Sequence, residues 1–114
     1  MFFEMNLGGG GIDLANSETV VKTPTSSFTT INVTLQRPPK CVIGFLLYRG
    51  STSNKMVYIY DVDANVIYRY YEGTKGTIPP DDASNQVFKY ENGSIYVKAG
   101  SENYRQSTQY VIIY

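Results

Sequence analysis

The chain contains no histidine and no tryptophan. Histidine is the commonest general base and the commonest metal ligand in proteins, so its absence removes the side chain best suited to both roles. Serine and threonine are plentiful, but a hydroxyl nucleophile needs a neighbouring base, which histidine cannot supply here. We therefore expect no catalytic residue, no cofactor and no enzymatic activity.

Cysteine occurs once, as Cys41, so no disulfide can form within the chain. This residue opens the apolar run CVIGFLL, where a buried free thiol is the usual outcome. No apolar run approaches the roughly 20 residues that a membrane-spanning helix needs. We expect no membrane span.

Charge of one sign is also missing, because 10 lysine and arginine residues balance 10 aspartate and glutamate residues. A protein that binds nucleic acid through phosphates needs a clustered basic surface, and the sequence contains no basic run. We therefore expect no nucleic-acid partner. A net charge near zero is poor at keeping copies of a protein apart in solution, which favours a protein that belongs to an assembly.

One acidic segment has part of the spacing of a calcium loop. Asp61, Asp63 and Asn65 alternate, and Glu72 follows eleven residues after the first of them. The sixth position should be glycine but is Val66. Aspartate and asparagine are also the ordinary residues of tight turns, so we expect a turn here and no metal site.

The N-terminal segment, residues 1–17, differs from the rest of the chain. Four consecutive glycines at 8–11 have high backbone entropy and no side chain to pack, which predicts a flexible arm and no strand. Before them stands an apolar cluster of Phe2, Phe3, Met5 and Leu7. We expect this arm to anchor the protein on a neighbouring subunit, while residues 18–114 form the folded domain.

From residue 18 onward the apolar residues follow a period of two, which is typical of strands. The sequence Asn92-Gly93 is a strong signal for a hairpin, and residues 73–85 are expected to form the longest loop. The expected strands span residues 18–22, 27–35, 41–49, 56–61, 66–72, 86–91, 94–99 and 104–114. This pattern predicts an all-β fold of seven or eight antiparallel strands, either a β-sandwich or a small barrel.

Two of the expected strands have distinct patterns. In residues 27–35 apolar and polar side chains alternate, so this strand is expected to be half-buried. Residues 41–49 are almost continuously apolar, which predicts a strand that is buried on both faces.

Tyrosine occurs eleven times, and four of these residues form two pairs. Tyr58 and Tyr60 lie two apart on one strand, and Tyr68 and Tyr70 lie two apart on its hairpin partner. Each pair projects from one face of its strand, and the two pairs could stack across the hairpin. The functional interpretation is an aromatic platform for sugar rings or a protein partner, and the structural one is cross-strand packing.

The order of motifs in residues 30–114 resembles a β-rich domain of bacteriophage and prophage virion proteins. An alternating strand leads through a proline-lysine break into an apolar strand, then to a Tyr-Asp-x-Asp turn, an aromatic-basic strand, an Asn-Gly turn and a short strand before the last one. These motifs are Ile31–Leu35, Pro38–Lys40, Cys41–Tyr48, Tyr60–Asp63, Tyr68–Tyr71, Asn92–Gly93 and Ser94–Lys98.

The resemblance implies a non-enzymatic structural or host-adhesion role in the tail, a fibre or a head appendage of the virion. Its partners would be other virion proteins, further copies of the chain and a glycan or protein of the host surface. Closed symmetry in such appendages favours a homotrimer. Localisation would be the virion, assembled in the bacterial cytoplasm. The alternative is a carbohydrate-binding module that uses the four tyrosines.

Overall fold

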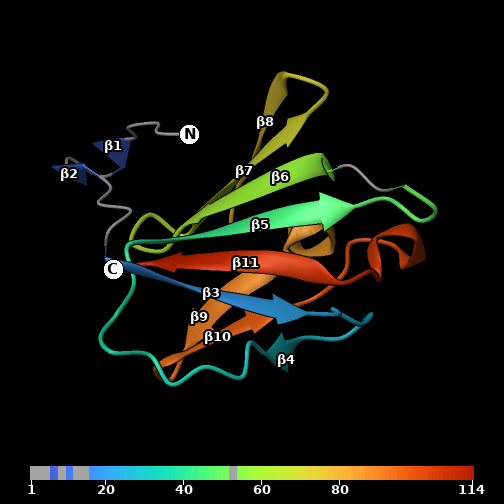
Figure 1. Ribbon diagram of the computed structural model, residues 1–114. Helices are drawn as coiled ribbons and strands as arrows, with labels where there is room; N and C mark the ends of the chain where they lie inside the picture. The colour runs from blue at the N-terminus through green and yellow to red at the C-terminus, as the bar shows by residue number, and fades with distance from the viewer. Residues whose placement is uncertain (1–5, 8–9, 12–15, 52–53) are drawn as a thin grey trace.

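The computed structural model describes residues 6–7, 10–11, 16–51 and 54–114. Two antiparallel sheets pack face to face, one of six strands and one of three (Figure 1). The larger sheet has the order β3-β11-β5-β6-β7-β8, and the smaller has the order β4-β10-β9. The strands are β3 (Ser17–Lys22), β4 (Thr29–Thr30), β5 (Cys41–Leu47), β6 (Asn54–Asp61), β7 (Val66–Tyr71), β8 (Thr74–Ile78), β9 (Phe88–Glu91), β10 (Ser94–Val97) and β11 (Thr108–Ile113).

These two layers confirm the all-β prediction, and of the two expected alternatives they correspond to the β-sandwich. Over the described ranges the helical content is two short 3-10 turns, η1 (Ala83–Asn85) and η2 (Glu102–Tyr104). No helix among the described residues is long and apolar enough to cross a membrane.

Strand β11 joins the two ends of the domain. It lies between β3 and β5, so Ile113 pairs with Ser17 on one side and with Cys41 on the other. The backbone N–H of Tyr114 donates to the carbonyl of Asn16 at 3.0 Å. The chain before residue 17 therefore leaves the domain beside the C-terminal end of β11.

Strand β5 is buried on both faces, as its continuous apolar sequence predicts. Val42 and Leu46 face the smaller sheet and belong to the main core. Cys41 and Ile43 face the other way and belong to a second apolar cluster. Apolar side chains on both faces of this strand are removed from water, and this burial stabilises the strand at the centre of the sheet.

The main core is built around the ring of Phe88. It stacks on Tyr60 with 5.6 Å between ring centroids and meets Tyr58 and Tyr110 edge-on at 6.4 Å and 5.9 Å. Such offset and edge-to-face geometries are the favourable ones for aromatic rings. Gly44 lies opposite this cluster and leaves room for it, because a Cβ there would be 3.2 Å from both Phe88 and Tyr110.

The predicted strand at residues 27–35 is wrong over most of its length. Only Thr29 and Thr30 pair with β10, and Asn32 takes a positive φ of 62°, which ends the ladder. The alternating burial nevertheless persists, because Ile31 is buried and Val33 packs against the core. The period of two therefore indicated which side chains face inward, and the backbone hydrogen bonding differs from a strand.

The predicted long loop at residues 73–85 is also wrong, because its first part forms β8 against β7. Glu72 and Gly73 make the tight turn, with φ of 50° and 80°. Two successive residues at positive φ are what a two-residue hairpin of the primed type requires. The hairpin at Asn92-Gly93 has the same geometry, with φ of 51° and 77°, and this prediction is confirmed.

The N-terminal segment contains a short ladder that the glycine run did not predict. β1 (Asn6–Leu7) pairs with β2 (Gly10–Gly11) in antiparallel fashion. Phe2, Phe3 and Met5 lie outside the described residues, as does the side chain of Leu7. The anchoring role expected for these four side chains therefore stays a prediction.

Candidate binding surfaces

The two tyrosine pairs lie on opposite faces of the large sheet, so the expected stacking across the hairpin is wrong. In the β6–β7 ladder Tyr58 pairs with Arg69, whereas Tyr68 pairs with Ile59. Directly paired residues share a face, and neighbours along a strand alternate. The register thus places Tyr58 and Tyr60 on the inner face, toward the small sheet, and Tyr68 and Tyr70 on the outer face.

The inner pair belongs to the core. Tyr58 is 6% exposed and Tyr60 is 2% exposed, and both contact Phe88. The hydroxyl of Tyr60 donates to Oδ1 of Asn65 at 2.9 Å, so its polar end is satisfied at the turn after β6. For this pair the interpretation as structural packing is the one that fits, and the four tyrosines do not form one platform.

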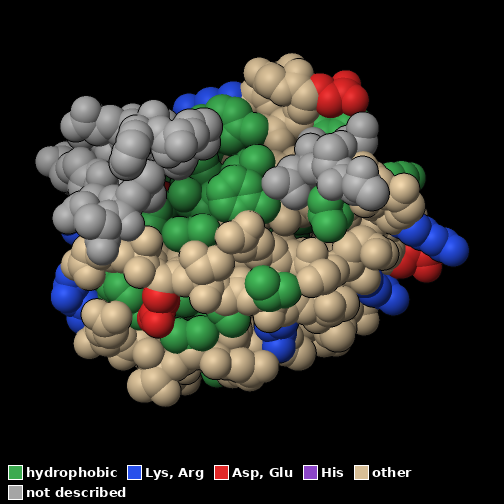
Figure 2. Space-filling view, viewed as in Figure 1, with side chains coloured by type: hydrophobic (Ala, Val, Ile, Leu, Met, Phe, Trp, Pro, Cys, Tyr) green, Lys and Arg blue, Asp and Glu red, His purple; other side chains and the backbone are tan. Residues whose placement is uncertain are grey.

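The outer pair belongs to an apolar surface that crosses the centre of the large sheet. One row across the strands consists of Val111, Ile43, Ile59 and Tyr68, and the next consists of Gln109, Phe45, Val57 and Tyr70. We call these two rows the outer-face patch. Figure 2 looks onto this side of the molecule and shows hydrophobic side chains gathered over the sheet.

The outer-face patch is unusual for a two-layer sandwich. An antiparallel sheet in such a fold normally turns polar side chains toward water on its outer face. Here Ile43 and Ile59 are only 2% and 6% exposed, and the larger residues around them are partly buried. Val21, on the same face of β3, is 64% exposed. The large sheet thus has an apolar surface on each side.

The inner face of the large sheet becomes more polar toward the β7–β8 turn. Its deepest row is Val42, Tyr60, Ile67 and Ile78, and the next rows contain Arg69 and then Tyr71. The small sheet has three strands against six, so it does not extend over all of β7 and β8 (Figure 1). The inner face near the β7–β8 turn is therefore the part that water can reach.

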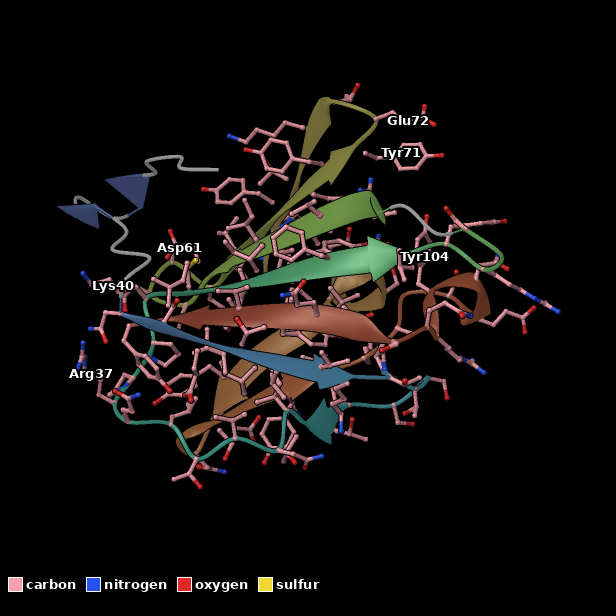
Figure 3. All side chains as sticks on the ribbon, viewed as in Figure 1. Arg37, Lys40, Asp61, Tyr71, Glu72 and Tyr104 are labelled. Atoms are coloured by element: carbon pink, nitrogen blue, oxygen red, sulfur yellow. The ribbon has the colours of Figure 1, made fainter. Side chains whose placement is uncertain are left out.

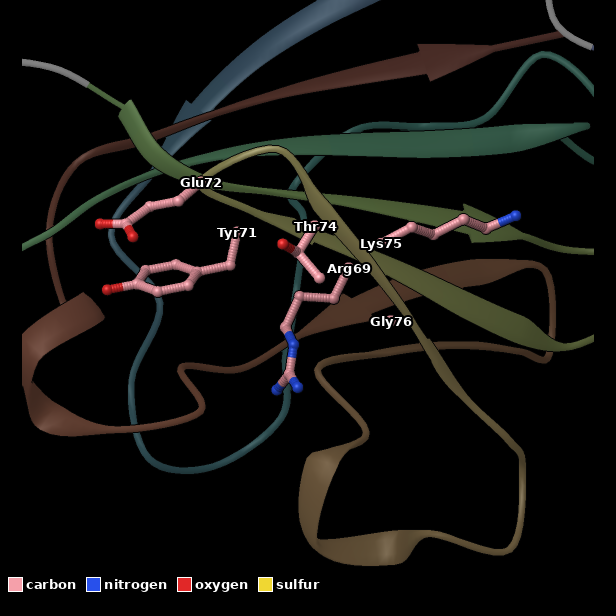
Figure 4. Close-up of a pocket in the computed structure, with 6 residues that line it drawn as sticks. All are labelled: Arg69, Tyr71, Glu72, Thr74, Lys75 and Gly76. Carbon is pink, nitrogen blue, oxygen red and sulfur yellow. The ribbon is translucent and has the colours of Figure 1, made fainter.

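A hollow of about 350 Å³ lies at this end of the inner face. It is lined by Arg69, Tyr71, Glu72, Thr74, Lys75 and Gly76, and we call it the Arg69 hollow. Figure 4 shows Arg69, Tyr71 and Glu72 on one side of the hairpin and Lys75 pointing away from them. The Lys75 ammonium lies 4.6 Å from the ring centre of Tyr68, on the outer face.

Two further tyrosines lie at the same end of the molecule as the hollow. Tyr48 and Tyr104 meet edge-on at 5.6 Å between ring centroids. Figure 3 shows Tyr71, Glu72 and Tyr104 at the same end of the molecule. Burial raises the pKa of Tyr104, the hydroxyls of Tyr71, Tyr58 and Tyr48 raise it further, and Arg69 opposes them.

Arg69 interacts with the buried hydroxyl of Tyr58. Burial raises the pKa of Tyr58, while the charge of Arg69 and a hydrogen bond from it act in the opposite direction. The Arg69 charge also helps to lower the pKa of Asp82, where hydrogen bonding from Asn85 is the largest cause. The positive charge of Arg69 therefore acts on a buried hydroxyl and on the loop after β8, and Arg69 also lines the hollow.

The acidic segment after β6 forms a tight turn closed by a hydrogen bond from the backbone to an aspartate side chain. Oδ1 of Asp61 accepts from the backbone N–H of Ala64 at 3.2 Å, and Asn65 takes a positive φ of 54°. Within the described residues no group of three or more potential metal-ligating side chains comes together.

Comparisons with protein-family models, with curated proteins and with solved structures found no match to this chain. The two candidate surfaces are therefore argued from their own geometry.

Sequence reasoning did not find the Arg69 hollow. Arg69 and Tyr71 stand in the aromatic-basic strand, but their face is fixed only by pairing with β6 and β8. The signal that could have located the hollow is Glu72-Gly73, read as a two-residue turn between two short alternating segments.

Proposed function

We propose that this chain is a non-enzymatic structural protein of a bacteriophage virion that assembles through the outer face of its large sheet. The observation that carries the proposal is the outer-face patch, because an apolar sheet surface is stabilised when another layer covers it. The order of strand motifs in residues 30–114, which resembles virion domains, supports the choice of a virion. The protein would be displayed on the tail, a fibre or a head appendage.

The partner we propose for the outer-face patch is a second copy of this chain, in a closed homotrimer. A net charge of zero leaves little repulsion between copies. Residues 1–17 carry the apolar side chains Phe2, Phe3, Met5 and Leu7, which match an apolar surface in chemistry. The arm departs at Asn16, beside the end of β11 and thus beside the sheet that carries the patch.

The mass of the full chain in solution, measured by light scattering, tests the proposal. We expect a trimer that Tyr70→Glu converts to a monomer, because a carboxylate within an apolar contact loses its hydration. Thr77→Glu is the matched control, since Thr77 is exposed on the same face but at the edge strand β8. A monomeric full chain would refute the assembly.

Deletion of residues 1–11 tests the arm separately. We expect the trimer to dissociate, while the thermal unfolding of the sandwich remains cooperative. A deletion variant that remains a trimer would show that the arm does not join the subunits. The outer-face patch alone would then have to hold the assembly together.

Glycan binding is the second candidate function, and the Arg69 hollow favours it. A platform of Tyr58, Tyr60, Tyr68 and Tyr70 cannot serve this function, because the first two lie in the core. The hollow instead combines an exposed tyrosine with charged and hydroxyl groups at a surface depression, and these groups can donate hydrogen bonds to the hydroxyls of a ligand and accept them.

A further inference from the structure

We propose that the Arg69 hollow binds a neutral sugar ring of a glycan, with Tyr71 as the stacking surface and Arg69 and Glu72 as the polar contacts. This inference rests on the second candidate function and is independent of assembly, because the hollow opens from the inner face of the large sheet. It replaces the four-tyrosine platform with a different set of residues.

Tyr71 provides the flat apolar surface. It is 44% exposed, whereas Tyr58 on the neighbouring strand of the same face is 6% exposed. A tyrosine ring is rigid and has a hydroxyl at its far end, so it can contact the C–H face of a sugar with little loss of side-chain entropy. Tyr48 is 42% exposed at the same end of the molecule, next to Tyr104.

The charges around the hollow favour a neutral ligand over an acidic one. Among the described residues the one ion pair joins Lys89 to Glu91, and Arg69 forms none with any of them. The two positive charges of Arg69 and Lys75 at the hollow are nevertheless matched by the two negative charges of Glu72 and of Asp82, whose pKa Arg69 helps to lower. A guanidinium donates and a carboxylate accepts, so together they match the hydroxyl groups of a sugar, which do both.

Gly76 provides the space above the guanidinium. It pairs with Arg69 across the β7–β8 ladder, and a Cβ built on it would be 3.8 Å from Nη2 and 3.9 Å from Nε. No side chain at this position of β8 therefore covers Arg69. The volume of about 350 Å³ is at the small end of the range for ligand sites, which suits one or two sugar rings.

The experiment displays the full chain on streptavidin, to raise the avidity of a weak site, and applies it to an array of neutral and sialylated glycans. We expect binding to neutral glycans. Gly76→Val should abolish it, because the valine side chain occupies the space above the guanidinium without removing a polar group and suits a strand. Tyr71→Ala should weaken it about tenfold through the loss of buried apolar area. Thr77→Val, on the outer face of the same strand, should bind as the unmodified chain does.

Three results would overturn the inference: no binding to any glycan, binding to sialylated glycans alone, or full binding by the Gly76→Val variant. Thermal unfolding of each variant confirms that the sandwich is intact. The mass in solution is measured on the same samples, so that loss of glycan binding with an unchanged mass separates this inference from the assembly proposal. Amide shifts of Thr74 and Gly76 in NMR spectra, on addition of the best neutral oligosaccharide, locate the contact.

Discussion

At the scale of single residues, Gly44 has the least room for a side chain of the glycines in residues 16–51 and 54–114. An added Cβ would lie 3.2 Å from Phe88 and from Tyr110, two rings that are themselves enclosed by the core. We expect Gly44→Ala to lower the free energy of unfolding by about 1–3 kcal/mol, because the rings must shift. Urea denaturation measures this change.

Gly76→Ala is the control for that measurement, since its new Cβ would meet only ordinary contacts at 3.8 Å. Equal stability of the two variants would mean that the aromatic cluster around Phe88 can move away from β5 at no cost.

The thiol of Cys41 is expected to be inert in the folded protein. Cys41 is 0% exposed, and burial, with the nearby Asp61 carboxylate, raises its pKa to about 12. A thiol reacts as the thiolate, which is scarce at neutral pH for such a group. We expect no reaction with a disulfide reagent in native buffer and one equivalent in denaturant. Rapid modification of the native protein would show that the first residues of β5 separate from β6 and β11.

For single residues, the sequence predicted whether a side chain is buried better than it predicted the functional role of that side chain. The continuous apolar run around Cys41 and the alternation of Ile31 and Val33 both identified buried side chains correctly. Tyr58 and Tyr68 could not be assigned to faces, because hairpin residues share a face only when the register pairs them. The length of the loop between the strands leaves that register open in the sequence.

At the scale of elements, the Asn92-Gly93 turn sets the register of β9 and β10. Gly93 has a φ of 77°, and a Cβ added to it would meet no atom within 4 Å, so only its backbone conformation opposes a side chain. We expect Gly93→Ala to destabilise the fold by about 1 kcal/mol. Urea denaturation again gives the change.

Gly100→Ala is the matched variant, because Gly100 does not take a positive φ and its added Cβ would be 3.6 Å from Val87. If both alanine variants lose the same stability, the cost arises from something other than the left-handed conformation.

Elements with strong local signals were predictable, and those that depend on distant partners were not. The strands at 41–49, 56–61 and 66–72 combine apolar periodicity with clear turns, and the structure contains all three. β8 is polar and glycine-containing, so it is a strand only because β7 offers it an edge. Such short polar edges also limit pairing between molecules.

At the scale of the whole molecule, stability is expected to fall in alkaline solution. Burial raises the pKa of Cys41, Tyr58, Tyr60 and Tyr110 in the folded state. The folded state therefore retains protons that the unfolded state releases above about pH 8.5 for cysteine and about pH 10 for tyrosine. The stability from the protonated groups is fully present below those values and decreases as pH rises through the folded pKa values.

Urea denaturation at about pH 7, 9 and 10.5, chosen to bracket the ordinary cysteine and tyrosine pKa values, checks this dependence. We expect the free energy of unfolding to be lowest at the highest pH, with the tyrosinate absorbance appearing together with unfolding. A free energy that stays constant over the whole range would mean that the tyrosine hydroxyls reach water in the folded protein.

The overall class of fold followed from the spacing of strands and turns, but the partition of the strands into sheets of six and three did not. That partition depends on β11, whose partners β3 and β5 are distant in the sequence. The Arg69 hollow exists because the two sheets differ in width, so the candidate site could not be predicted before the topology was known.

The position of β11 has a consequence for the rate of folding. The ladder between Ser17–Lys22 and Thr108–Ile113 joins strands from nearly opposite ends of the domain's sequence. Contacts so distant in sequence form slowly, on the order of milliseconds to seconds. Until β11 enters, β3 and β5 each present an unpaired edge. A chain interrupted during synthesis before residue 108 would expose both edges, and such a nascent chain would depend on chaperones to avoid aggregation.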